Sequence, residues 1–336
     1  MAQTNTRLFS PRGLGSVLGV LAMASSAAIS PAQAQSGYPA KPIRLIVTQA
    51  AGSVPDILGR ILAEQMSRDL GRPITVDNRA GADGIVGMEV ASKAVPDGYT
   101  IALASQSVLA IEPLVRKNMP YDAARDFSPI AVIVDDTGGI GWFVNSSLPI
   151  KTLPEMIAYA KANPGKLTFA TNTSSAFMFG EWVKKRASLD ILNVPYKAGP
   201  QGVQDTVSGV VAMMLTATSA MEAYVKSGQV RAIALSNARR LEDWKDLPIV
   251  AETFPDFGMS SWVVMVAPAG VAPDIIQRLN QSAAISLKQP QYVQQVRKLR
   301  WINVDGPRTP QGTGEFIRAG REQWARVLRE IGQLPN

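Results

Sequence analysis

The chain has 336 residues, with 34 basic and 27 acidic side chains and a formal net charge of +7. It contains no cysteine and no histidine, which excludes disulfides, Ser-His-Asp and Cys-His catalysis and the usual zinc sites. The modest positive charge is scattered along the sequence, so we expect a solvated surface and no nucleic-acid partner. A carboxylate pair could still act in acid–base catalysis, but no spacing singles one out.

The first residues are typical of an export signal. Arg7 and Arg12 supply positive charge, and residues 14–29 are apolar and small but too short and too rich in Gly and Ser to span a bilayer comfortably. Ala32-Gln33-Ala34 is a small-x-small cleavage motif, so residues 1–34 are predicted to be a signal peptide. A retained membrane anchor is the alternative. No later apolar run approaches the ~18 residues that a membrane span needs.

The stretch from Ile43 to Asp56 predicts a strand, a loop of small residues and the start of a helix. Residues 43–47 have strand character, and apolar residues at helical spacing continue from about Asp56 to Leu70. Such a unit leaves unpaired backbone N–H groups at the helix N-terminus, which favours an anion. The loop is neither a P-loop nor a G-x-G-x-x-G fingerprint, so a simple turn is the alternative.

The rest of the first half alternates between strands and helices, which predicts a parallel sheet with helical crossovers. A helix is expected at 85–94, with Val86, Val90 and Ala91 facing inward. Gly138-Gly139 is a plausible crossing between domains, because paired glycines interrupt regular structure. Strands are expected at 73–77, 99–104, 127–134 and 141–144.

The second half repeats the alternation. Its first helix is marked by the capping box Thr152-Leu153-Pro154-Glu155, with proline in the first turn. Residues 171–175 form a hydroxyl-rich loop, and a helix follows through Phe179 and Trp182. The last predicted helix carries an apolar stripe that we expect in the core. Further strands are expected at 166–170, 191–194, 210–215, 230–235 and 262–267, and further helices at 203–207, 273–288, 290–299 and 310–331.

Two α/β sets and a late return strand predict two lobes around a cleft. The discontinuous lobe 1 would comprise residues 35–140 and 262–336, and lobe 2 residues 141–261. Loops at strand carboxyl ends are where α/β sheets bind ligands. They offer hydroxyls, amides and helix N-termini but no evident nucleophile–base pair, so we predict binding of a small polar molecule, no catalysis, no cofactor and no metal. The loops expected to face one another are 50–55, Ser105-Gln106, 171–175 and Tyr196-Lys197.

Six blocks follow one another along nearly the whole chain after residue 34. They are Tyr38-Pro39-x-Lys41-Pro42-Ile43-Arg44, Ala50-Ala51-Gly52-Ser53-x-x-Asp56, Asp77-Asn78-Arg79-Ala80-Gly81-Ala82-x-Gly84, Pro96-Asp97-Gly98-Tyr99-Thr100, Val194-Pro195-Tyr196-Lys197, and Ser260-Ser261-Trp262 followed by Ala267-Pro268-x-Gly270. In this order they resemble the substrate-binding proteins of tripartite tricarboxylate transporters, the Bug or TctC type found in the periplasm of Gram-negative bacteria.

The resemblance implies a type II periplasmic-binding fold, with two α/β lobes around a cleft joined by crossing strands. It implies a periplasmic protein that captures a small organic carboxylate by lobe closure and delivers it to membrane transporter subunits, which it meets transiently as a monomer. A co-receptor that feeds a sensor kinase and an enzyme on a binding-protein scaffold are the alternatives. The sequence names neither the carboxylate nor the permease.

The resemblance also implies which residues hold the ligand. The first-lobe loop would bind one carboxylate, with Asp56 beside it as a ligand contact or as the first-turn acid of the helix. The hydroxyl-rich loop would hold the other end. The resulting candidates are Ala51, Gly52, Ser53, Asp56, Ser105, Gln106, Asn172, Thr173, Ser174, Ser175, Phe177 and Tyr196.

The chain departs from the family pattern in the second lobe. Ala176 and Phe177 stand where histidines are frequent, and Ala212 stands where an aspartate is common. These changes favour a more apolar wall, and hence a ligand with one carboxylate and an apolar or aromatic body. Packing of Phe177 in the core, with no effect on the ligand class, is the alternative.

Overall fold

The computed structural model describes residues 37–136, 139–237, 240–241, 244–255, 257, 261–299, 302–303 and 309–334. The predicted signal peptide and Gly138 of the predicted crossing lie outside these residues. Within the described ranges, no helix is long and apolar enough to cross a membrane.

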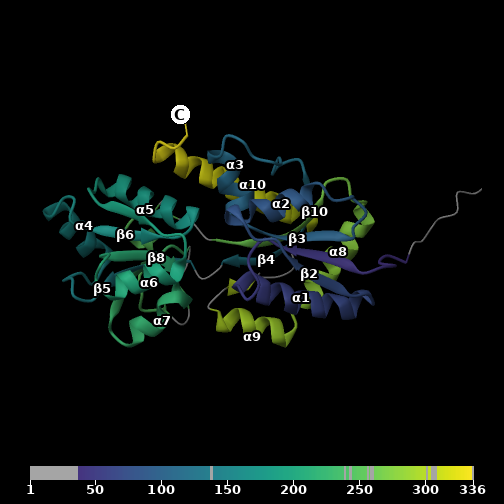
Figure 1. The fold of residues 1–336 in the computed structure, drawn as a ribbon, viewed down its shortest axis with the longest axis horizontal. Helices are drawn as coiled ribbons and strands as arrows, with labels where there is room; N and C mark the ends of the chain where they lie inside the picture. The colour runs from purple at the N-terminus through teal and green to yellow at the C-terminus, as the bar shows by residue number, and fades with distance from the viewer. Residues whose placement is uncertain are drawn as a thin grey trace, which may run out of the picture. The chain divides into compact units, whose positions relative to one another are not determined.

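The first sheet has six strands in the order β11-β4-β10-β3-β1-β2 (Figure 1). The first four strands of the chain run parallel to one another, and β10 lies between β3 and β4, antiparallel to both. This confirms the predicted parallel sheet and the late return strand. The strands are β1 (Ile43–Val47), β2 (Ile74–Asn78), β3 (Thr100–Ser105), β4 (Phe127–Asp136), β10 (Val263–Pro268) and β11 (Ile302–Asn303).

Helices cover both faces of this sheet. Successive residues of its strands point to opposite faces, and the side chains on both faces are apolar, so each face needs a covering layer. Leu45 of β1 belongs to the core shared with α1, α8 and α9, whereas Ile46 belongs to the core shared with α2 and α10. The helices are α1 (Val54–Leu70), α2 (Ile85–Ser92), α3 (Glu112–Val115), α8 (Pro273–Leu287), α9 (Pro290–Lys298) and α10 (Pro310–Glu330). Two short segments join them, the 3-10 turn η1 (Ala82–Gly84) and the π-helical η2 (Ser107–Ile111).

The second sheet has five strands in the order β7-β6-β8-β5-β9. Strands β6, β7 and β8 run parallel to one another, and β5 runs antiparallel to both β8 and β9. The strands are β5 (Ile140–Asn145), β6 (Thr168–Thr171), β7 (Leu192–Pro195), β8 (Met213–Ala217) and β9 (Val230–Leu235). The helices are α4 (Leu153–Ala162), α5 (Ser174–Ala187), α6 (Gly199–Val207) and α7 (Thr218–Lys226), followed by the short 3-10 turn η4 (Val250–Glu252).

One of the three residues predicted to face inward on α2 does not do so. Val86 is 41% exposed, while Ile85, Met88 and Ala91 are buried. Gly87 sets this orientation, because a Cβ there would lie 2.9 Å from both the Thr48 side chain and the Arg79 carbonyl oxygen. The smallest residue of the helix therefore faces β1, and Val86 turns to solvent.

Several element boundaries also differ from the sequence prediction, among them the start of α6, which begins at Gly199 and not at Val203. Helix α1 begins at Val54, two residues early, because Pro55 is favourable in a first helical turn. Ser174 and Ser175 belong to the first turn of α5 and not to the loop, because the Thr173 hydroxyl caps the helix by accepting from the Ala176 N–H at 3.2 Å. Helices α3 and α7 and the short strand β11 were not predicted from the sequence.

The chain passes from the first sheet to the second just before β5. Gly139 has φ 67°, and a Cβ there would lie 2.0 Å from the Asn237 amide oxygen, so glycine is required at this point. The returning chain contacts the outgoing one, since the Ser236 hydroxyl accepts from the Ile140 N–H at 2.7 Å and the Ser236 N–H donates to the Ile140 carbonyl at 2.9 Å.

The C-terminal end of α10 reaches the second lobe. Glu330 accepts hydrogen bonds from the Trp182 indole N–H at 2.8 Å and from the Arg186 Nε–H at 2.7 Å. Trp182 packs in turn on Phe254 and Phe257, with ring centroids 5.5 and 4.8 Å away. A helix that covers the first sheet is thereby attached to a helix that covers the second.

Two helical glycines give a matched test of this packing. A Cβ on Gly180 of α5 would lie 2.4 Å from the ring of Phe169, which is fully buried against Trp142, so Gly180→Ala should destabilise the protein by about 1–3 kcal/mol. A Cβ on Gly314 of α10 would make an ordinary 3.4 Å contact, so Gly314→Ala should be neutral or stabilising by up to about 1 kcal/mol. Melting temperatures followed by tryptophan fluorescence measure both changes, and equal effects would contradict the packing.

Candidate functional site

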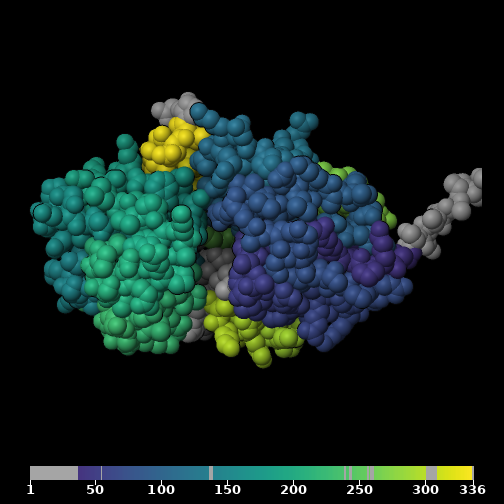
Figure 2. All heavy atoms as spheres, viewed as in Figure 1, coloured from purple at the N-terminus to yellow at the C-terminus, as the bar shows by residue number. Residues whose placement is uncertain are grey.

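A cavity of about 580 Å³ lies between loops of the two lobes. The space-filling view shows the surface hollowed between the purple-to-blue residues of the first sheet and the teal-to-green residues of the second (Figure 2). This volume is within the usual range for a small-molecule site. The lining residues are Asp83, Thr171, Asn172, Thr173, Ser174, Phe177, Asn193, Pro195, Tyr196 and Lys197.

The junction of β6 and α5 supplies much of the polar lining. The Ser174 hydroxyl donates to the Glu112 carboxylate at 2.7 Å, which links α5 directly to α3 of the first lobe. The half-buried Asn172 side chain has no hydrogen-bond partner among the described residues, so its amide stays available to a ligand. The first turn of this 14-residue helix also brings the positive end of the helix dipole to the cavity.

The junction that follows β7 supplies the opposite side. The Tyr196 hydroxyl donates to Asp205 at 2.7 Å, and partial burial together with this hydrogen bond raises the pKa of Tyr196 to about 12. Tyr196 is therefore a neutral phenol at physiological pH. The Asn193 amide donates to the Thr171 hydroxyl at 2.9 Å, and Lys197 is exposed at the cavity.

Phe177 lies both at the cavity wall and against the core, the two positions that the sequence left open. Its half-buried ring lines the cavity and also packs against the buried core of the molecule. An apolar surface therefore lies beside the donors of α5, and its effect on the ligand class stays a prediction.

The sequence reasoning missed two cavity residues, Asn193 and, with greater consequence because of its charge, Asp83. Asp83 was the unassigned position in the block Ala80-Gly81-Ala82-x-Gly84, and nothing in the spacing marked it. Its carboxylate accepts from the Ser107 hydroxyl at 2.6 Å. Asp83 is exposed as a whole, but the protein groups around its carboxyl partly desolvate it and raise its pKa; the Ser107 hydrogen bond opposes this shift, and the nearby charge of Glu112 adds to it.

Asp56 organises the loop between β1 and α1. Its buried carboxylate accepts from the Gly52 N–H at 2.8 Å, from the Asn78 amide at 2.9 Å and from Arg60 Nε at 3.1 Å. Burial opposes ionisation, but these hydrogen bonds and the Arg60 charge outweigh it and hold the pKa of Asp56 below its usual range. All of these partners are protein groups, so the observed role of Asp56 is to shape the loop.

The twelve candidates from the sequence therefore divide into two groups. Those that line the cavity are Asn172, Thr173, Ser174, Phe177 and Tyr196. Those that do not are Ala51, Gly52, Ser53, Asp56, Ser105, Gln106 and Ser175. Ser175 lies in the first turn of α5, the other members of the second group lie at the ends of first-lobe strands and helices or in the loops between them, and a ligand role for all of them stays a prediction. The buried Ser53 hydroxyl has no hydrogen-bond partner within the described part of the chain.

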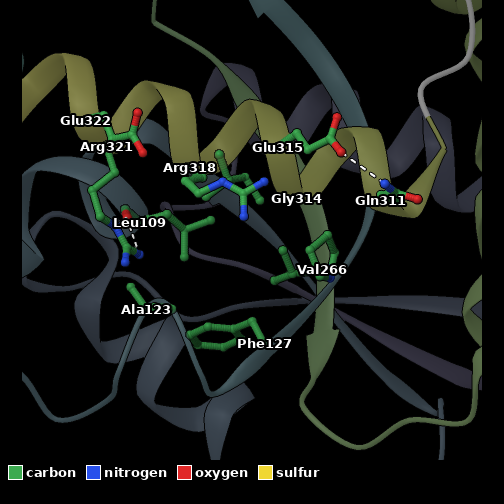
Figure 3. Close-up of a pocket in the computed structure, with 13 residues that line it drawn as sticks. Leu109, Ala123, Phe127, Val266, Gln311, Gly314, Glu315, Arg318, Arg321 and Glu322 are labelled. Atoms are coloured by element: carbon green, nitrogen blue, oxygen red, sulfur yellow. Dashed lines mark hydrogen bonds between the residues drawn. The ribbon is translucent and has the colours of Figure 1, made fainter.

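A second cavity of about 630 Å³ lies beneath α10, away from these loops (Figure 3). Phe127 and Val266 form apolar walls, and Arg321 donates through Nε and Nη2 to the Leu109 carbonyl at 3.2 and 3.0 Å. Glu315 on its rim accepts from Gln311 at 3.0 Å. The lining residues of this cavity all come from the first lobe, and its Arg321 and Glu315 are already paired with protein atoms, so we take the cavity between the lobes as the candidate site.

The Asp56 network predicts a pH-dependent loss of stability on Asp56→Asn. The charged form of Asp56 contributes stability that is present above the unfolded pKa of about 3.9 and is lost as the pH falls through the lower folded value. The substitution should therefore cost about 1–3 kcal/mol near neutral pH and progressively less below about pH 4. Urea denaturation at several pH values measures this.

Glu64→Gln is the matched control, because Glu64 lies on the same helix in an exposed ion pair with Arg68. It should change the free energy of unfolding by less than about 1 kcal/mol at any pH. Equal effects of the two substitutions would show that the Asp56 network does not stabilise the loop.

Comparison with known proteins identifies the family to which this chain belongs. The family model described as "Tripartite tricarboxylate transporter family receptor" matches residues 58–333. Protein BugT of Bordetella pertussis is 33% identical over 320 residues, which cover 94% of this chain and 96% of BugT.

Two solved structures extend the likeness to the fold. The R. palustris protein Rpa4515, whose structure was solved with adipate, has a TM-score of 0.77 and 27% identity, covering 88% of this chain and 98% of that one. The periplasmic binding protein BugD has a TM-score of 0.75 and 26% identity, covering 88% of this chain and 99% of that one. The chain therefore belongs to the tripartite tricarboxylate transporter receptor family and has the two-lobe α/β fold of periplasmic solute-binding proteins.

Proposed function

We propose that this protein captures a small organic carboxylate in the cavity between its lobes and delivers it to a membrane transporter of the tripartite tricarboxylate type. The observation that carries the proposal is the gathering, within the described ranges, of unpaired donors at one cavity: the Asn172 amide, the Lys197 ammonium and the N-terminus of α5. Donors of this kind suit an anion. Adipate, with which the structure of the related protein Rpa4515 was solved, is a dicarboxylate and supports this ligand class.

The first-lobe loops would complete the site when the lobes close. Ala51, Gly52 and Ser53 lie after β1, and Ser105 and Gln106 lie at the end of β3. A buried hydroxyl without a partner is costly, so Ser53 would donate to a ligand or to an ordered water. In this proposal lobe 1 comprises residues 35–140 and 262–336, lobe 2 comprises residues 141–261, and only the closed state makes all contacts.

We also propose that the ligand leaves chemically unchanged. The described cavity residues supply donors and an apolar ring, and Tyr196 has too high a pKa to serve as a base near neutral pH. The protein would act as a monomer that meets the membrane subunits transiently, because delivery requires it to bind and release them in each cycle.

Ligand binding predicts a thermal shift that depends on Asn172. A panel of mono-, di- and tricarboxylates, amino acids and sugars is added to protein stripped of co-purified ligand by unfolding and refolding. A binder at ~100 times its dissociation constant should add about 2.7 kcal/mol, or several degrees in Tm. Asn172→Ala should weaken the best acid about tenfold or more, because a hydrogen bond to a charged group is lost.

Gln294→Ala is the control for this variant, since Gln294 is exposed on α9 and does not line the cavity. It should bind like the unmodified protein. A response confined to neutral sugars, or an Asn172→Ala variant with unchanged affinity, would contradict the proposed site.

If residues 1–34 are a cleaved signal peptide, the exported protein should have a single, defined N-terminus. When the full chain is produced in a Gram-negative host, the periplasmic fraction should contain a protein that begins at Gln35, as read by intact mass spectrometry. Ala34→Asp places a charge in the small-residue cleavage motif and should leave uncleaved precursor. Membrane-bound protein that retains residues 1–34 would instead support the anchor alternative.

A further inference from the structure

Asp83 is the cavity residue that comes from the first lobe, opposite the α5 and β7 junctions. Its backbone is left-handed, with φ 55° and ψ 26°, and Ala82 before it also has a positive φ of 46°. Such conformations cost about 1–3 kcal/mol in a non-glycine residue, although aspartate tolerates them better than most. The fold thus holds an acidic side chain at this wall at an energetic cost.

One oxygen of the Asp83 carboxylate is fixed and the other is open. Oδ2 accepts from the Ser107 hydroxyl at 2.6 Å, and Ser107 is buried in the first turn of η2. Oδ1 has no hydrogen-bond partner among the described residues. The Ser107 contact orients the carboxylate, and Oδ1 stays available as an acceptor at the cavity wall.

Asp83 offers a negatively charged acceptor, whereas the opposite side of the cavity offers hydrogen-bond donors. Glu112 is nearby, but its own oxygens are already paired, with Ser174 at 2.7 Å and with Arg116 at 3.2 Å. The positive charge of Arg116 also acts on Asp83, in the opposite sense to Glu112. On the second-lobe side the cavity presents Lys197 and the Asn172 amide. The two walls therefore favour opposite ligand groups, an anion at the second lobe and a hydrogen-bond donor at Asp83.

We infer that Asp83 makes the site selective for carboxylic acids that also carry a hydroxyl or ammonium donor, over plain acids of the same carbon skeleton. The inference rests on the proposed function. A ligand carboxylate placed at Asp83 would be repelled by a like charge. A hydroxyl or ammonium group there would form a charge-assisted hydrogen bond to Oδ1.

The test uses acids that differ only in the donor. Calorimetric titration compares succinate with malate and aspartate, glutarate with 2-hydroxyglutarate and glutamate, and 3-phenylpropionate with phenyllactate and phenylalanine. In the set whose skeleton fits, the unmodified protein should bind a donor-bearing member about tenfold or more tighter than the plain acid.

Asp83→Gly is the decisive variant, because glycine adopts the left-handed backbone without strain and removes the carboxylate. It should bind the plain acid at least as tightly as the unmodified protein does and should lose the preference for the donor. Asp83→Asn keeps the size of the side chain and should reduce the preference. Asp190→Asn is the control for charge, since Asp190 is exposed and outside the cavity, and it should keep the preference.

The outcomes separate this inference from the proposed function. If no acid binds the unmodified protein, both are overturned. If acids bind but the plain and donor-bearing members have equal affinity, or if the preference survives in Asp83→Gly, only this inference fails. If Asp83→Gly and Lys197→Gln weaken all acids equally, Asp83 joins the lobes through an ion pair with Lys197 and does not select the ligand, which also overturns the inference.

Discussion

The arrangement of both lobes depends on the pairing of β10 between β3 and β4. All six residues of β10 are buried, and Val263 pairs with Ser105 on one side and with Val134 on the other. Because β10 follows the second sheet in the chain, this pairing forces the chain to leave the first sheet after β4 and to return to it. The two crossing segments then lie together at Ile140 and Ser236, and the loops of both sheets can meet at one cavity.

Two carboxylates of the first lobe, Glu330 and Glu112, supplement the crossing segments with polar contacts to the second lobe. Glu330 of α10 accepts from Trp182 and Arg186 of α5, and Glu112 of α3 accepts from Ser174 at the start of the same helix. Helix α5 is thus attached to the first lobe near both of its ends. Closure on a ligand must either keep these contacts as a pivot or exchange them for others, and its energy is limited by the difference in ligand contacts between the two states.

The cavity combines satisfied and unsatisfied polar groups. Tyr196, Asn193 and Thr171 are paired with protein atoms, which fixes the shape of the wall. Among the described residues, Asn172, Lys197 and one oxygen of Asp83 remain to recognise a ligand. Fixed walls and a few open groups are what a selective binding site requires, because little conformational entropy is then lost when the ligand binds.

Local patterns in the sequence predicted much of the fold. The apolar runs of β1 and β10 and the capping residue Thr152 mark elements whose cause lies within a few residues, and the structure contains them with small shifts of boundary. The order of these elements was enough to predict two α/β sets and a late return strand. The hydroxyl-rich segment was also recognised, since hydroxyl side chains before a helical pattern are a local signal for a cap.

Tertiary structure alone decided the rest. Val86 turns outward because Gly87 must approach Thr48, which lies 39 positions earlier in the chain, and α7 was not recognised at all. Asp83 reaches the cavity because a strained turn and the Ser107 hydroxyl place it there, while Asp56, of the same residue type, is consumed by the hydrogen bonds of its own loop. Composition by itself determined that any ligand must be recognised without histidine or cysteine, which leaves hydroxyls, amides and charged groups as the available side chains. Which of those groups face a ligand depends on contacts between distant segments, and these arise only when the chain folds.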